Sequence, residues 1–148
     1  MKIGILGCGV ISNTYIQEIQ RIYEKTLEIV AVADMDQARA KATAEKYQVP
    51  FALTVEELLA YKDIQLIVNL TPPMAHKELN MRILESGKHL FCEKPFALTV
   101  EDAQEVAQLA EEKGLYIGAA PDTFLTAQIQ RCRKLLALRY RQYDVSGR

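Results

Sequence analysis

The chain opens with Lys2-Ile3-Gly4-Ile5-Leu6-Gly7-Cys8-Gly9-Val10-Ile11-Ser12, the stretch that decides its fold. Residues 2–6 are an apolar run of strand length that leads directly into two glycines. From Val10 to Lys25 apolar residues recur at spacings of three and four, which predicts a helix with one buried face. Those positions are Val10, Ile11, Tyr15, Ile16, Ile19, Ile22 and Tyr23. A second apolar run over residues 27–33 predicts another strand, which ends at Asp34.

The same alternation continues along the rest of the chain. Further strands are predicted at 51–52, 65–70, 88–92 and 115–119, and helical segments at 36–47, 54–60, 73–86, 99–113 and 123–138. The strands are continuously apolar, as is typical of strands buried on both faces. We therefore predict an α/β domain with a doubly wound, Rossmann-like parallel sheet that helices cover on each side.

The composition indicates one ordinary globular domain. The 148 residues carry 18 Lys and Arg against 19 Asp and Glu, and 49% of them are hydrophobic. Cys8, Cys92 and Cys132 lie far apart without a Cys-x-x-Cys spacing, so we predict neither a disulfide framework nor a metal site. No apolar run reaches the length of a membrane span, and the N-terminus does not resemble a signal peptide. We expect a cytoplasmic protein with no membrane partner.

Basic residues gather at the end of the chain, where residues 131–148 hold six of them against Asp144 alone. Such a run suggests a nucleic-acid contact, but most basic runs are solvated helix faces, and positive charge near a helix C-terminus is favourable in itself. The rest of the chain is acidic and carries no nucleic-acid-binding motif, so we disfavour that interpretation.

The two glycines have the placement of a dinucleotide-binding turn. Gly7-x-Gly9-x-x-Ser12 follows a predicted strand and opens a helix, although Ser12 replaces the usual third Gly or Ala. The N–H groups near Val10 and Ile11 would face a pyrophosphate at the positive end of the helix. Asp34 would accept hydrogen bonds from a ribose. The alternative is a plain strand-to-helix turn followed by a solvated acidic residue.

The cofactor choice rests on the residues around Asp34. Its carboxylate would repel a 2′-phosphate, so we expect NAD. NADP remains the alternative because Arg39 is close in sequence and could reach over such a phosphate.

Two further motifs follow predicted strands. Thr71-Pro72-Pro73-x-x-His76 comes directly after the strand at 65–70, at the sheet edge where α/β proteins bind ligands. His76 alone could equally be a structural residue of a helix that Pro73 begins. Lys88-His89-Leu90-Phe91-Cys92-Glu93-Lys94-Pro95 delivers a charged pair to the same edge. Lys94 could bind a substrate hydroxyl and relay its proton, with Glu93 orienting it, or the two could be an ordinary surface pair.

Taken in order, these motifs resemble the Gfo/Idh/MocA family of nicotinamide-dependent oxidoreductases from residue 2 to about residue 136. The resemblance rests on Gly7-x-Gly9, Ala31-Val32-Ala33-Asp34, Thr71-Pro72-Pro73-x-x-His76, Gly87-Lys88-His89 and Glu93-Lys94-Pro95. It implies a hydride transfer between a nicotinamide and a hydroxyl-bearing carbon of a sugar, polyol or related metabolite, with Lys94 as the catalytic residue. It also leads us to expect a cis peptide bond between Lys94 and Pro95 that aims the lysine inward.

The full set of expected site residues follows from the motifs and the resemblance together. The predicted cofactor-binding residues are Gly7, Cys8, Gly9, Val10, Ile11, Asp34, Met35, Thr71, Pro72, His76, Glu93 and Lys94. Asp122 is a candidate substrate residue, because the segment from Ala119 to Leu125 resembles the family's crossing between domains. The segment departs from the family where Thr126-Ala127-Gln128 replaces a Gly-rich run.

Family members usually continue into a second α/β domain, which walls the substrate pocket. We expect a dinucleotide-binding domain over residues 1–122, a crossover helix over 123–138 and an out-of-family tail over 139–148, which would make the chain a truncated or a natural single-domain relative. Catalysis by this chain alone is then in doubt, and the alternative function is a non-catalytic nucleotide-binding or interaction module. Apolar residues of the crossover helix could support a homo-oligomer.

Overall fold

The computed structural model describes residues 1–120 and 131–132. Six parallel strands form one sheet in the order β3-β2-β1-β4-β5-β6. The strands are β1 (Lys2–Leu6), β2 (Glu28–Ala33), β3 (Phe51–Leu53), β4 (Leu66–Asn69), β5 (His89–Cys92) and β6 (Ile117–Ala119). The helices are α1 (Val10–Ile22), α2 (Gln37–Tyr47), α3 (Val55–Ala60), the 3₁₀ turn η1 (Pro73–Ala75), α4 (His76–Glu85) and α5 (Val100–Glu112). This confirms the predicted doubly wound fold.

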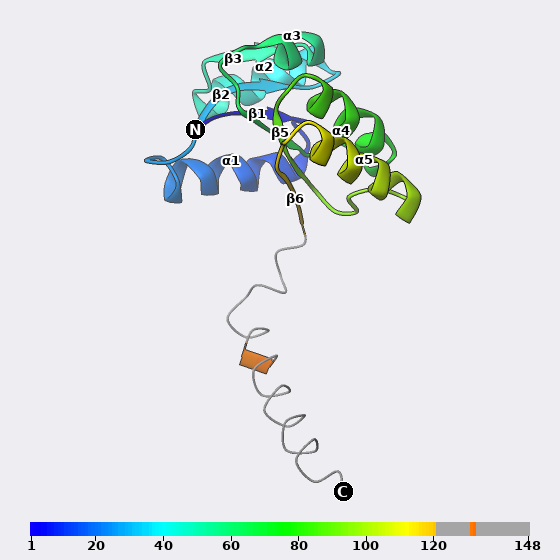
Figure 1. The fold of residues 1–148 in the computed structure, drawn as a ribbon. Helices are drawn as coiled ribbons and strands as arrows, with labels where there is room; N and C mark the ends of the chain where they lie inside the picture. Colours follow the sequence, from blue (N-terminus) through cyan, green and yellow to red (C-terminus); the bar gives the residue numbers. More distant parts are fainter. Residues whose placement is uncertain (121–130, 133–148) are drawn as a thin grey trace, which may run out of the picture.

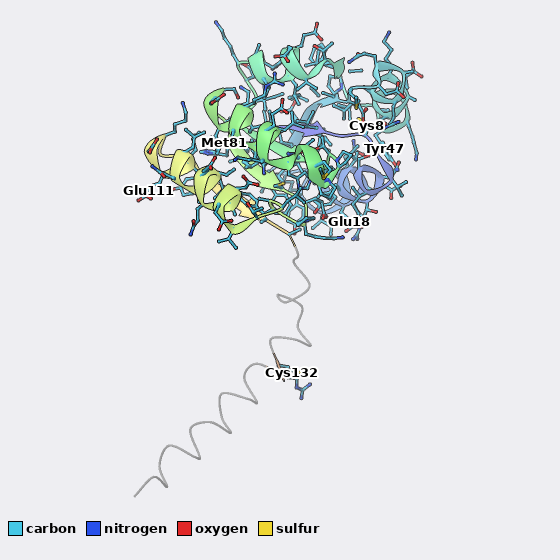
Figure 2. The ribbon with its side chains drawn as sticks, turned by 90° about the vertical axis from the view of Figure 1, so that its right-hand side faces the viewer. Cys8, Glu18, Tyr47, Met81, Glu111 and Cys132 are labelled. Carbon is cyan, nitrogen blue, oxygen red and sulfur yellow. The ribbon has the colours of Figure 1, made fainter. Side chains whose placement is uncertain are left out.

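Helices cover both faces of the sheet. Ile16 of α1 and Ala40 of α2 pack into one buried apolar cluster, whereas Leu58 of α3, Ile83 of α4 and Val106 of α5 pack into another on the opposite face. Figure 1 shows α1 on one side of β1 and α3 on the other. In Figure 2, α4, which carries Met81, lies beside α5, which carries Glu111. The two clusters explain why the central strands are apolar on both faces.

The first helix is shorter and less buried than its apolar spacing predicts. It ends at Ile22, where the N–H of Tyr23 still donates to Ile19 O and the chain then turns back toward β2. Val10 is 90% exposed, and Ile11, Ile22 and Tyr23 are exposed as well. The buried residues of the helix are Ser12, Ile16 and Ile19, so one narrow face packs on the sheet while the apolar side chains at both ends remain exposed.

Local capping sets the starts of three other helices. The Asp36 side chain accepts hydrogen bonds from two N–H groups of α2, and Thr99 caps α5. Thr54 and Glu57 form a reciprocal capping box at the start of α3. The caps at Asp36 and Thr54 come within three residues of the preceding strand, so the loops before α2 and α3 are short, whereas a longer loop that contains Lys94 and Pro95 precedes the cap at Thr99.

Several predictions fall outside the described residues. These are the candidate substrate residue Asp122, the crossover helix over 123–138 with its proposed role in oligomer formation, and the tail over 139–148. In the described part of the chain, no helix is both long and apolar enough to cross a membrane.

Candidate functional site

The turn between β1 and α1 has two glycines with different roles. Gly7 has φ +97°, and a Cβ placed on it would lie 2.8 Å from the backbone carbon of Leu70. Gly7 therefore allows β1 and the end of β4 to approach closely. A Cβ on Gly9 would meet nothing within 4 Å, so the chain there has open space beside it. Gly9 also precedes α1 without a side-chain cap, and the first turn of α1 holds no acidic residue.

The residue at the third position of the glycine motif fits this turn. Ser12 is buried, and its hydroxyl donates a hydrogen bond to Gly9 O at 2.6 Å. A small side chain bonded to its own helix leaves room for α1 to pack closely on β1. The departure from Gly or Ala at this position therefore does not disturb the turn.

Asp34 follows β2 and is buried against the glycine turn. Its Oδ2 accepts the N–H of Cys8 at 2.8 Å, and its Oδ1 accepts the N–H of Asp36 at 2.9 Å. The guanidinium of Arg39 lies 3.6 Å from Oδ1 and also 3.5 Å from a carboxylate oxygen of Asp36. The carboxylate is thus held in place by the protein, and Arg39 is drawn toward it by two negative charges.

Cys8, one of the predicted cofactor-binding residues, lies behind the glycine turn. Its N–H is already bonded to Asp34, its thiol lies inside the domain near Ala33 O, and the residue is 6% exposed. Burial raises the pKa of this thiol to about 11. Cys8 therefore supports the turn from behind and does not line the open side of the pocket; Figure 2 labels its position.

A buried polar network lies behind the loop that follows β4. Both the N–H and the hydroxyl of Thr71 donate to Asn69 Oδ1, at 3.2 and 2.7 Å. Asn69 in turn donates to Asn80 of α4 at 2.8 Å, and Asn80 donates to Phe96 O at 3.3 Å. The loop after β4 is therefore connected through side chains to the segment that follows β5.

His76 makes a second connection between the same two segments. The ring is fully buried, with Nδ1 at 2.6 Å from Pro95 O and Nε2 at 2.7 Å from Thr71 O. Although the sequence predicts that His76 contacts the cofactor, no part of this residue reaches the surface. It acts on the site through Thr71 and Pro95.

The charged pair after β5 is divided between two environments. One Glu93 oxygen accepts the hydroxyl of Tyr15 at 2.8 Å, and the other accepts the N–H of Lys94 at 2.8 Å. Glu93 thereby ties the backbone of Lys94 to α1. Lys94 itself is exposed. The peptide bond between Lys94 and Pro95 is cis, as predicted.

These loops enclose a cavity of about 330 Å³ at the carboxyl edge of the sheet. Of the predicted residues, it is lined by Gly7, Gly9, Val10, Ile11, Asp34, Met35, Thr71 and Pro72. Arg39 and apolar side chains of α3 and α4 complete its wall. Cys8, His76, Glu93 and Lys94 do not line it. The apolar side chains of Val10 and Met35 are both at least 90% exposed, so the pocket presents uncovered apolar surface beside an uncapped helix.

Sequence reasoning missed three residues of this arrangement. Tyr15 reads as part of the buried face of a helix, although its hydroxyl reaches Glu93. Asn69 and Asn80 are fully buried. An asparagine within the otherwise apolar run at 65–70 is a detectable signal, because a buried amide needs partners. Nothing in the local sequence around Asn80 identifies it as one of those partners.

A larger and more open hollow of about 760 Å³ lies at the opposite edge of the sheet, beside Gln65, Lys88 and His89. These residues precede or begin strands, whereas ligands of open α/β sheets bind beyond the strands' carboxyl ends. Lys88 is buried there, and its ammonium donates to Tyr61 O at the end of α3. Across the described ranges, no cluster of His, Cys, Asp and Glu is suited to hold a metal ion.

Comparison with known proteins identifies the family to which the sequence is similar. The model of the Gfo/Idh/MocA oxidoreductase family, with an NAD-binding Rossmann fold, matches residues 1–120. The chain is 29% identical over 116 residues to inositol 2-dehydrogenase of Salmonella typhimurium, covering 77% of this chain and 34% of that protein. It is 30% identical over 138 residues to trans-1,2-dihydrobenzene-1,2-diol dehydrogenase of Macaca fascicularis, covering 93% and 41%.

A solved structure shows the same fold. An NAD binding oxidoreductase from Klebsiella pneumoniae superposes with a TM-score of 0.83 at 26% identity, over 93% of this chain and 38% of that one. The chain therefore spans between about a third and two fifths of the length of these similar proteins.

Proposed function

Because the chain belongs to the Gfo/Idh/MocA family of oxidoreductases and forms its NAD-binding Rossmann fold, we propose that its pocket binds NAD(H) for hydride transfer. The proposed substrate carbon bears a hydroxyl, on a sugar, polyol or related metabolite, in keeping with the inositol and diol dehydrogenases that the chain resembles. The observation that carries the proposal is the 330 Å³ cavity, which brings Gly9, Asp34 and Thr71 from three loops to one edge of the sheet.

The residues of the cavity suit the parts of a dinucleotide. The open space beside Gly9 and the uncapped start of α1 suit a pyrophosphate, since a helix N-terminus attracts negative charge. Asp34 suits a ribose, because its oxygens retain lone pairs beyond those that accept backbone N–H groups. The exposed apolar side chain of Met35 suits the face of a base.

We further propose NAD rather than NADP. A 2′-phosphate would bring negative charge close to Asp34 and Asp36. Arg39 is the cation that could offset it, but Arg39 already lies between these two carboxylates. Reaching a phosphate would require it to leave both.

In this proposal Lys94 holds and moves the substrate's hydroxyl proton at its Nζ atom. When bound, the nicotinamide supplies or accepts the hydride. Glu93 acts as an orienting residue, since it fixes the backbone of Lys94, whose side chain is exposed. The exposed lysine is consistent with a reaction that needs a further covering element over this edge. A cytoplasmic location stays our prediction, in keeping with free thiols at Cys8 and Cys92.

Calorimetric titration with NADH and NADPH tests the proposal. We expect NADH to bind more tightly, and Asp34→Ala to weaken it by roughly tenfold or more, because a hydrogen bond to a charged group contributes about 1.5–3 kcal/mol. Asp36→Ala is the matched control. It also removes one negative charge, but from a half-exposed carboxylate that lies two residues after Asp34. Circular dichroism must show that each variant is folded.

The outcomes separate binding from catalysis. Equal loss in the two aspartate variants, or no binding of either cofactor by the folded wild type, would exclude the assigned pocket. NADH binding without turnover of any sugar or polyol would favour the non-catalytic nucleotide-binding module instead. Loss of turnover in Lys94→Ala, with NADH binding kept, would support the role of Lys94.

A further inference from the structure

The ring of His76 lies between two groups that can only accept hydrogen bonds. Nδ1 is 2.6 Å from the carbonyl oxygen of Pro95, and Nε2 is 2.7 Å from that of Thr71. The ring is fully buried, so water cannot replace either contact. Both distances lie at or below the short end of the range for N–H···O hydrogen bonds.

The chemistry of imidazole decides what these contacts mean. A neutral ring has one N–H donor and one nitrogen lone pair. In either neutral tautomer, a lone pair would face a carbonyl oxygen at 2.6 or 2.7 Å, and two acceptors repel each other. Only the imidazolium form donates from both nitrogens. Bonds from a charged donor are also shorter than neutral ones, as these are.

Among the described residues, the charged groups on the neighbouring segments have partners other than the ring or face solvent. On the segment after β5, Glu93 is a carboxylate two residues before Pro95, and Lys94 is exposed to solvent. On α4, Lys77 is paired with Asp102 and Glu105 of α5. The nearest cation on the same helix is thus neutralised by the helix that packs against it.

We propose that His76 is a positively charged, hydrogen-bonded cross-link that joins Thr71 of the cofactor pocket to the Lys94–Pro95 segment. It keeps the relative positions of these two segments fixed. His76 is in this sense a positioning residue, because it touches neither the cavity nor the solvent. The neutral link through Asn69 and Asn80 runs in parallel between the same segments. The effect on cofactor binding rests on the proposed function, since it concerns the side of the pocket that Thr71 lines.

The protonation of the ring can be measured directly by ¹⁵N NMR of the wild-type chain at neutral pH. The chain has two histidines. His89 is an internal contrast, because its Nδ1 accepts the N–H of Tyr116 and must carry a lone pair. His89→Gln leaves His76 as the single signal and assigns it. We expect both nitrogens of His76 to carry a proton. One unprotonated nitrogen in His76 would overturn the proposal.

The coupling between the His76 cross-link and cofactor binding is tested by measuring the affinities of NADH and AMP by calorimetry. In His76→Gln we expect NADH affinity to fall roughly three- to thirtyfold, the range of coupling through such networks, while AMP affinity is unchanged, since AMP lacks the nicotinamide end. His89→Gln, at the other edge of the sheet, should change neither. Equal losses for NADH and AMP, or none, would overturn the coupling. Failure of wild type to bind NADH would instead exclude the proposed function and the role of the cross-link in it, while the NMR result would stand alone.

Discussion

Replacing Gly7 with alanine tests whether this glycine is needed for the fold itself. The new Cβ would lie 2.8 Å from Leu70 C, 2.9 Å from Leu70 O and 2.9 Å from Thr71 N. These are backbone atoms of a buried strand end, so they cannot rotate away. Overpacking of this kind costs about 1–3 kcal/mol, and a side chain at φ +97° adds about 1–3 kcal/mol of backbone strain. We expect a loss of about 2–6 kcal/mol in the free energy of unfolding.

The measurement is urea unfolding followed by circular dichroism, with Gly9→Ala as the matched control. A Cβ at Gly9 meets nothing within 4 Å, and its φ of −74° suits alanine. The stability of Gly9→Ala should therefore stay within about 0.5 kcal/mol of wild type, while NADH binding falls because the methyl group occupies the open side of the turn. Similar stability losses in the two variants would refute the division of roles between the glycines.

Three further predictions concern stability and reactivity. Thr54→Ala should cost about 1 kcal/mol in urea unfolding, because it removes the capping box of α3. Burial lowers the pKa of Lys88, so as the pH rises toward the ordinary value of 10.5 the unfolded chain keeps this proton when the folded chain has lost it. Stability should therefore rise with pH below 10.5, and Lys88→Met should lack that rise. Burial raises the pKa of Cys8 and of Cys92 to about 11, so a thiol-specific dye should react quickly with exposed Cys132 alone, and Cys132→Ser should remove the fast phase.

The sequence predicts the fold well because its signals are local. Each central strand is an apolar run, and each of these runs is followed by a turn residue or a helix cap, such as Asp36 and Thr54. The two faces of the sheet follow from that pattern. The prediction fails at the ends of α1, where Val10 and Tyr23 satisfy the apolar spacing but extend past the sheet they were expected to cover.

The site is less predictable because its connections run between distant segments. Motif spacing predicts Gly9, Asp34 and Thr71 at one edge of the sheet, and all three line one cavity there. It cannot show whether a motif residue faces the cavity or supports it from behind, and His76 belongs to the second kind. That distinction depends on which carbonyls fold around the ring, and one of them is 19 residues away.

Asp34 shows why support and binding are hard to separate by mutation. Its carboxylate fixes the N–H groups of Cys8 and Asp36 before any ligand arrives, so its orientation is set during folding. A preorganised acceptor binds a ribose hydroxyl without paying to order its own side chain. Under the proposed function, removing the carboxylate would loosen the glycine turn and delete the proposed ribose contact together. A change in cofactor preference is therefore better sought at Arg39, which is half exposed at the rim and holds no backbone group in place.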